Sequence, residues 1–216
     1  MTAVTETATS PSSRKASRPV RRQQLIDATI AVLARKGYSA LTVADVAKTA
    51  GLSVGIINFH FESKEKLLAA CLSHLAEEYY RNWHDALAVP GAREAERLQL
   101  IVLGAYNDKI FTPDKLAAWI AFWGETQGRP IYVEICSAYD DARTRAVNDL
   151  CEKIIKDGGY KLVPGTVMRA LESLGDGLWL GVAAGNSQAK FTITASQARQ
   201  ALQAMLVSFF PKHFQS

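Results

Sequence analysis

Residues 42–60 read TVADVAKTAGLSVGIINFH and hold two short, largely apolar segments on either side of Gly51. Thr42, with Asp45 three residues later, is typical of a helix N-cap followed by an acid in the first turn. Gly51 suits a tight turn that needs a positive φ, where a Cβ atom would clash. Small and apolar residues recur at a spacing that lets two helices cross closely. The segment predicts a helix-turn-helix over residues 42–61.

The second helix of such a motif enters the major groove of DNA, so its outer face is expected to carry the contacts. Backbone N–H groups at its start attract phosphate oxygens, and Gly55 lets the duplex approach closely. The amide of Asn58 suits a base edge or a phosphate. Two simpler interpretations stay open: Gly55 is only a weak helix position, and His60 is an ordinary surface histidine. The expected DNA contacts are Thr42, Ser53, Val54, Gly55, Asn58, His60 and Lys64.

The charge distribution also points to a polyanion. The chain has 216 residues and a net charge of +4. Residues 1–66 hold ten Lys and Arg against five Asp and Glu, whereas the remainder holds fifteen against sixteen. A basic N-terminal third on a near-neutral remainder is the asymmetry expected when one part of a chain meets nucleic acid. The same charges would also suit a solvated basic surface without a partner.

Residues 1–18 precede the first predicted helix and are rich in Ser, Thr and Ala. Because they lack an apolar stretch, we expect a disordered tail that is not a secretory signal. A basic run follows at its end, formed by Arg14, Lys15, Arg18, Arg21 and Arg22. This run would suit DNA phosphates or a minor groove, or serve only as a solubilising tail.

Beyond the tail, helical periodicity continues almost to the C-terminus, and no segment alternates with a period of two. Gly37 is placed to end the first helix in a left-handed cap. Ser63 begins a helix that extends to about residue 87. Further helices are expected over residues 94–110, 113–127, 130–156, 166–184 and 195–210. The sequence therefore predicts an all-α fold with about nine helices.

Other functional classes receive little support. The cysteines Cys71, Cys136 and Cys151 are far apart and give neither a disulfide framework nor a zinc site, which fits a reducing cytoplasm. No apolar run approaches the roughly 20 residues that cross a bilayer. The string GLSVG at 51–55 matches the GxSxG of serine hydrolases, yet a helix rather than a strand is expected before it. We therefore expect no enzyme, no metal site, no cofactor and no membrane partner.

The N-terminal region resembles the TetR family of bacterial regulators over about residues 19–79. Its segment LTVADVAKTAGLSVGIINFHFESKEKLL follows the family pattern T…IA…AGVS.G..Y.HF..K..L. Asn58 departs from this pattern, because the family usually has tyrosine at that position. The resemblance implies a DNA-binding domain at residues 19–79 and a helical domain for effector binding and dimerisation at residues 80–216.

Two blocks stand out in the C-terminal region, LAAWIAFWGETQGRPIY and ALESLGDGLWLGVAAGN. They resemble the choline-responsive BetI branch of that family. The resemblance implies a repressor that a small molecule, with choline as the candidate, releases from its operator in control of glycine betaine synthesis. It also implies a homodimer, paired through the last two helices, that reads a palindrome with recognition helices roughly 34–36 Å apart.

Aromatic residues of the C-terminal region suit such a ligand. Trp119 and Trp123 share one helix face, and aromatic faces attract quaternary ammonium ions by about 0.5–2 kcal/mol per ring. Asp176, expected to be buried in an apolar helix, is the candidate counter-charge, with Asp108 and Glu125 as second choices. The same rings would also suit a purely structural core. The expected ligand contacts are Trp119, Trp123, Tyr139, Asp176 and Trp179.

Three other interpretations compete with a choline-responsive repressor. The first is a TetR-type regulator of a different small ligand. The second is an effector-independent basic DNA-binding protein, which would bind with a steep salt dependence and little sequence preference. The third, a hydrolase that uses Ser53, needs a strand before Gly51. In the repressor model, the helix over residues 63–87 links the two regions and acts as the lever.

Overall fold

The computed structural model describes residues 17–124, 130–184 and 193–214. Within these residues the chain forms nine helices and no strand, which confirms the predicted all-α class. The expected disordered tail, apart from its last two residues, and Glu125 lie outside the described residues. The helices are α1 (Arg18–Ala40), α2 (Val43–Ala50), α3 (Val54–Phe61), α4 (Lys64–Leu87), α5 (Glu94–Gly104), α6 (Pro113–Trp123), α7 (Pro130–Gly158), α8 (Pro164–Ala184) and α9 (Ala195–Phe209).

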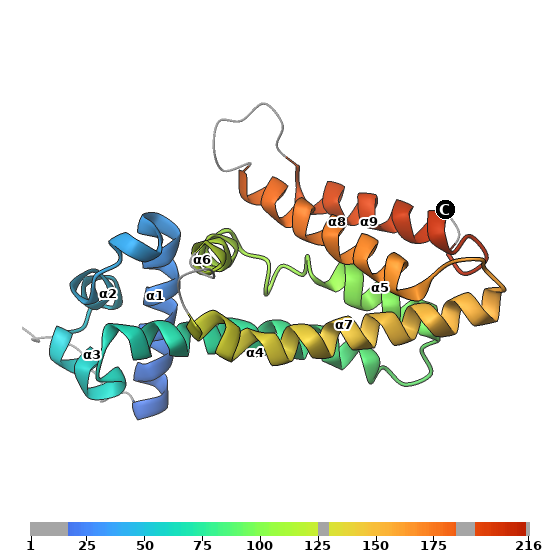
Figure 1. Cartoon of the computed structure of the whole chain (residues 1–216). Helices are drawn as coiled ribbons and strands as arrows, with labels where there is room; N and C mark the ends of the chain where they lie inside the picture. The colour runs from blue at the N-terminus through green and yellow to red at the C-terminus, as the bar shows by residue number, and fades with distance from the viewer. Residues whose placement is uncertain (1–16, 125–129, 185–192, 215–216) are drawn as a thin grey trace, which may run out of the picture.

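The helices form two groups joined by α4 and α6. α1, α2 and α3 cluster at one end, and the long helices α4 and α7 run side by side away from them (Figure 1). α8 pairs with α9, while α5 packs against α4, α7 and α9. α6 lies against α1 and also contacts α8. A change at the C-terminal group can therefore reach the N-terminal group through two separate helices.

Capping residues define several helix starts as the sequence predicted. The Ser63 hydroxyl accepts the N–H of Lys66 at 3.2 Å, and the Thr112 hydroxyl accepts that of Lys115 at 3.3 Å. Gly37 interrupts α1 with φ 74° and ψ 178°, after which one short turn continues to Ala40. The predicted break at Gly37 is confirmed, but the predicted left-handed cap was wrong: the φ is positive, whereas a ψ of 178° lies outside the left-handed helical region, in a conformation that glycine alone adopts readily.

Two predicted boundaries were wrong. α5 ends at Gly104 instead of residue 110, because the next residues form turns in which the Asn107 side chain accepts the N–H of Lys109 at 2.9 Å. α1 begins at Arg18, one residue before the helix predicted from residue 19, so Arg18 is helical and does not belong to a flexible tail, and Arg21 and Arg22 lie in α1. The rest of the basic run lies outside the described residues.

The core confirms the predicted periodicity of α1, where Leu25, Ile30 and Leu33 are buried. Thr29, the buried polar residue among them, donates its hydroxyl to the Leu25 carbonyl at 2.7 Å. α2, and not a strand, precedes the GLSVG string, so the backbone required of a serine nucleophile elbow is not formed there. Among the helices of the described ranges, none combines the length and apolarity of a membrane span.

Candidate DNA-binding surface and ligand cavity

The turn between α2 and α3 leaves one face of α3 open to solvent. Gly51 adopts φ 65° and ψ 33°, a left-handed conformation that confirms its predicted role. Its N–H reaches the carbonyls of Ala47 and Lys48 at the end of α2. α3 then buries Ile57 and Phe61 against the core. The opposite face of α3 has the exposure that a helix entering a DNA groove requires.

The seven predicted DNA contacts are all accessible. Thr42 caps α2, since its hydroxyl donates to the Asp45 carboxylate at 2.6 Å and accepts the Asp45 N–H at 3.2 Å. Ser53 occupies the N-cap position of α3 but makes no side-chain capping bond. The exposed members are Thr42, Ser53, Val54, Gly55 and Asn58, and the half-exposed members are His60 and Lys64.

Two arginines of α1 pack on α3 and bring positive charge to it. The Arg22 guanidinium lies 4.4 Å from the ring centroid of Phe61 and donates to the His60 carbonyl at 3.5 Å. The Arg18 guanidinium lies 5.6 Å from the ring centroid of Phe59. Because cation–π contacts hold a guanidinium over a ring, both charges are held close to α3.

These surroundings shift the pKa of His60. Burial, followed by the charges of Arg18 and Arg22, lowers the pKa of His60 below its ordinary value. Its ring packs edge-on against Phe59, with centroids 5.2 Å apart. Its Nδ1 is buried and has no hydrogen-bond partner within the described residues. A phosphate oxygen near this imidazole would favour the protonated form and so oppose the arginines.

Sequence reasoning missed two apolar residues on the open face of α3. Ile56 is 36% exposed and Phe59 is 67% exposed. Apolar residues in a short helix suggest burial, so the sequence did not indicate that Ile56 and Phe59 lie on the surface. The available signal was excess apolarity, since VGIINFHF carries more apolar side chains than the single buried face of an eight-residue helix can hold.

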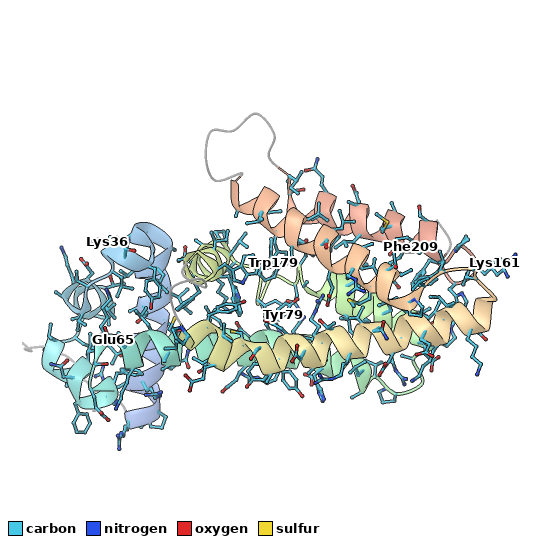
Figure 2. All side chains as sticks on the ribbon, in the orientation of Figure 1. Lys36, Glu65, Tyr79, Lys161, Trp179 and Phe209 are labelled. Atoms are coloured by element: carbon cyan, nitrogen blue, oxygen red, sulfur yellow. The ribbon has the colours of Figure 1, made fainter. Side chains whose placement is uncertain are left out.

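A cavity of about 260 Å³ lies among α4, α5, α6, α7 and α8. Four of its rings contact one another in a closed circuit: Tyr79, Trp119, Trp123 and Trp179. Successive centroids around the circuit are 6.4, 6.5, 6.0 and 5.7 Å apart. Figure 2 labels Tyr79 on α4 and Trp179 on α8, whose rings meet edge-on beside the cavity. The arrangement presents aromatic surfaces from three helices to one volume.

Charged groups complete the lining of the cavity. Arg143 donates to the Glu172 carboxylate at 2.9 Å, and its guanidinium lies 5.9 Å from the ring centroid of Tyr79. Asp140 and Asp176 also line the cavity. Desolvation raises the pKa of both aspartates, while the Arg143 charge acts in the opposite direction. With three carboxylates against one guanidinium, the cavity favours a cation.

Four of the five predicted ligand contacts line the cavity: Trp119, Trp123, Asp176 and Trp179. The prediction that Asp176 is buried was wrong, because its side chain is accessible to solvent where it borders the cavity. Tyr139 is not a lining residue. Its ring lies 5.1 Å from that of Tyr80, at the edge of α7 that packs on α4. Asp108 is exposed in the turn between α5 and α6, outside the lining.

Part of the polar and aromatic lining was missed from the sequence. It comes from α4, α7 and α8, which are far apart along the chain, and no local spacing connects these positions. The missed residues are Tyr79, Asp140, Arg143, Thr144 and Glu172. The Trp123 indole N–H donates to the Tyr132 hydroxyl at 2.7 Å, so part of the circuit is held by a hydrogen bond as well as by packing.

Two family models match separate parts of the chain. Residues 25–71, a range that includes α2 and α3, match the model of bacterial regulatory proteins of the tetR family. Residues 94–211 match the C-terminal domain model of BetI-type transcriptional repressors, which includes the cavity helices α5 to α8. The second match alone spans more than half of the chain.

Similar proteins agree with these matches. The HTH-type transcriptional regulator BetI of Serratia proteamaculans is 32% identical over 75% of this chain and 80% of its own length, and that of Klebsiella pneumoniae is 31% identical over 76% and 83%. A putative transcriptional regulator from Pseudomonas aeruginosa PAO1 has a similar fold, with a TM-score of 0.75 at 23% identity over 93% of this chain and 97% of its own. A putative regulator from Saccharomonospora viridis, solved in complex with choline, has a TM-score of 0.74 at 21% identity over 87% and 96%.

The helix-turn-helix, the C-terminal helical group and the matched relatives lead to one assignment. TetR regulators bind DNA and small molecules and act as dimers, and they are not enzymes. The chain belongs to the TetR family of transcriptional regulators and carries a BetI-type C-terminal domain.

Proposed function

We propose that the chain is a cytoplasmic, homodimeric repressor that a small quaternary ammonium ligand of the choline type releases from a palindromic operator. In this model residues 19–79 bind DNA, through the seven contacts predicted from the sequence, and residues 80–216 bind the ligand and pair the subunits. The proposal goes beyond family membership in naming both the direction of regulation and the chemistry of the effector.

The aromatic circuit with its excess of carboxylates is the observation that carries the proposal. A quaternary ammonium ion cannot donate a hydrogen bond, so aromatic faces and nearby negative charge are the groups that recognise it. The cavity volume of about 260 Å³ lies below the roughly 300–1,000 Å³ of sites for drug-sized ligands, which favours a small ligand. The BetI relatives and the choline-bound regulator of similar fold support the same ligand class.

The contacts of α6 and α4 supply a route from ligand to DNA. α6 carries Trp119 and Trp123 on the cavity, and its Phe122 ring lies 5.7 Å from the Tyr38 ring of α1. α4 carries Tyr79 on the cavity and begins at Lys64, three residues after α3 ends. A ligand that shifts either helix would therefore move α3 relative to the partner subunit, and a two-subunit operator would be bound less tightly.

The test compares choline with its neutral carbon isostere, 3,3-dimethylbutan-1-ol. We expect choline to bind, with a change in tryptophan fluorescence, and to lower affinity for the DNA upstream of the chain's own gene at fixed salt. The isostere should do neither at the same concentration, since it lacks the charge. Equal effects of the two compounds, or no effect of choline, would contradict the proposal.

A matched pair of variants locates the site. Asp176→Asn removes one cavity charge and should weaken choline binding about 5- to 30-fold, which corresponds to about 1–2 kcal/mol of lost attraction. Asp108→Asn removes an exposed charge outside the cavity and should leave binding unchanged. Equal losses in the two variants would mean that net charge, and not the cavity, governs the response.

A further inference from the structure

The open face of α3 is unusually apolar for a surface. Among the described residues nine large hydrophobic side chains are exposed, and three of them lie on the eight residues of α3. They are Val54 at 42%, Ile56 at 36% and Phe59 at 67% exposure. Single exposed apolar residues are ordinary, but two large ones, Ile56 and Phe59, that are neighbours on one side of a short helix form a cluster that indicates an interaction surface.

The charges around this cluster select its partner. Arg18 and Arg22 pack on rings of α3 itself, and Lys64 begins the next helix. An apolar protein surface would desolvate these cations without compensation, which is costly. Duplex DNA instead offers phosphates to the cations and apolar groups in the major groove between them.

We infer that Ile56 and Phe59 read the methyl groups of thymine in the operator. The C5-methyl of thymine is the apolar group that a base pair presents in the major groove. Ile56 and Phe59 are three residues apart and so lie on one side of the helix. The inference rests on the proposed DNA-binding function and adds to it the base that the apolar face recognises.

The residues next to Ile56 and Phe59 also suit contact with an A·T pair. Gly55 has no side chain, and a Cβ there would meet only the Ser53 hydroxyl at 3.8 Å, so the space beside Ile56 is open to the duplex. Asn58 is exposed between Ile56 and Phe59 in sequence, and an asparagine amide pairs with the N6 and N7 of adenine. An A·T pair would therefore satisfy a polar and an apolar contact from one helix.

The experiment removes the methyl group without changing base pairing. The probe is the tightest duplex that the full-length chain selects from a random library, remade with deoxyuridine in place of one thymidine at a time. We expect at least one substitution in each half-site to weaken binding about fourfold, the factor for burying one methyl group. In Ile56→Ala or Phe59→Ala protein the same substitution should cost less than about 1.5-fold, because the methyl has lost its contact.

Controls separate this inference from the proposed function. Leu100→Ala, at an exposed apolar position of α5, should keep the full deoxyuridine effect. Phe59→Ala should unfold close to the wild-type temperature because that side chain is 67% exposed, and binding of Ile56→Ala, where the side chain is 36% exposed, is measured below its own unfolding temperature. If a duplex is selected but no deoxyuridine matters, or the effect persists in both α3 variants, the inference is overturned while DNA binding stands. If no duplex is selected, the proposed function itself fails.

Discussion

We expect His60 to make operator binding sensitive to pH. Its pKa in the free chain is lowered by burial and by Arg18 and Arg22, and a bound phosphate would raise it again. DNA binding would then take up a proton, so affinity should increase as pH falls through the interval between the two pKa values. We expect the operator Kd to fall as the pH is lowered from about 8 to about 5.5 at fixed ionic strength. The decrease should be at most about one decade per pH unit for each proton taken up.

Two variants test the assignment to His60. His60→Gln should flatten the pH dependence, whereas His84→Gln, at an exposed position near the end of α4, should retain it. The pH dependence of the folding stability has the opposite sign. The unfolded chain has the higher His60 pKa, of about 6.5, and binds more protons, so the contribution of this residue to folding is lost as pH falls below that value. A rise in affinity at low pH therefore cannot come from a more stable fold.

Only some residues of the cavity could be predicted one at a time from the sequence. Trp119, Trp123 and Trp179 were predicted because tryptophans are conspicuous, and two of them share a local helix face. Arg143 and Glu172 lie 29 residues apart on two helices and form an ion pair only after α7 and α8 pack together. Nothing in the spacing of the sequence encodes such a contact.

At the scale of elements, the turn between α2 and α3 offers a matched pair of glycines. Gly51 has φ 65°, and a Cβ there would meet no atom within 4 Å, so alanine would add backbone strain and no clash. We expect Gly51→Ala to lower the free energy of unfolding by about 1–2 kcal/mol. Gly55 is helical, so Gly55→Ala should raise it by up to about 1 kcal/mol, through higher helix propensity, while weakening DNA binding.

Thermal unfolding and operator binding of the two variants check this pair. Gly51→Ala should bind DNA normally at temperatures where it is folded, and Gly55→Ala should bind poorly although it is folded at higher temperatures. Destabilisation by both substitutions would show that Gly55 is required by the fold, and that its absent side chain is not an opening for the duplex.

Helix boundaries were predictable where a side chain makes a local bond to the backbone. Thr42, Ser63 and Thr112 each cap the helix that follows, and these signals depend on neighbours within three residues. The end of α5 was not predictable in this way. Besides the local turn at Asn107, it involves a distant contact in which Asn82 of α4 donates to the Gly104 carbonyl at 3.0 Å, across 22 residues of sequence.

At the scale of the whole molecule, α8 and α9 are the candidate dimer surface. Leu202 and Leu206 of α9 are buried in the chain's own core, so other side chains of these two helices would have to form the interface. Leu180 remains 50% exposed on α8, and Met205 and Phe209 are half-buried on α9. If a twofold axis passes through this surface, a charged residue substituted for Leu180 would lie in an apolar contact in both subunits.

Leu180→Glu should therefore weaken dimerisation by more than about tenfold, since an unpaired buried charge costs several kcal/mol. Light scattering over a concentration series would measure this, and operator affinity should fall in parallel because both half-sites must be occupied. Val89→Glu, in the turn between α4 and α5, is the control and should remain dimeric. A fully dimeric Leu180→Glu protein would exclude this surface as the interface.

The contact between α6 and α1 should set the strength of the coupling between ligand and operator. If saturating choline lowers operator affinity by some factor, about 5- to 150-fold in typical systems, saturating operator must lower choline affinity by the same factor. Phe122→Leu removes the edge-on ring contact with Tyr38 but keeps an apolar side chain in the core. We expect both factors to shrink together by up to about tenfold, the value of an aromatic pair, while choline binding to the free protein is kept. Calorimetry with and without operator measures both factors, and an unchanged coupling in this variant would mean that the signal travels through α4 alone.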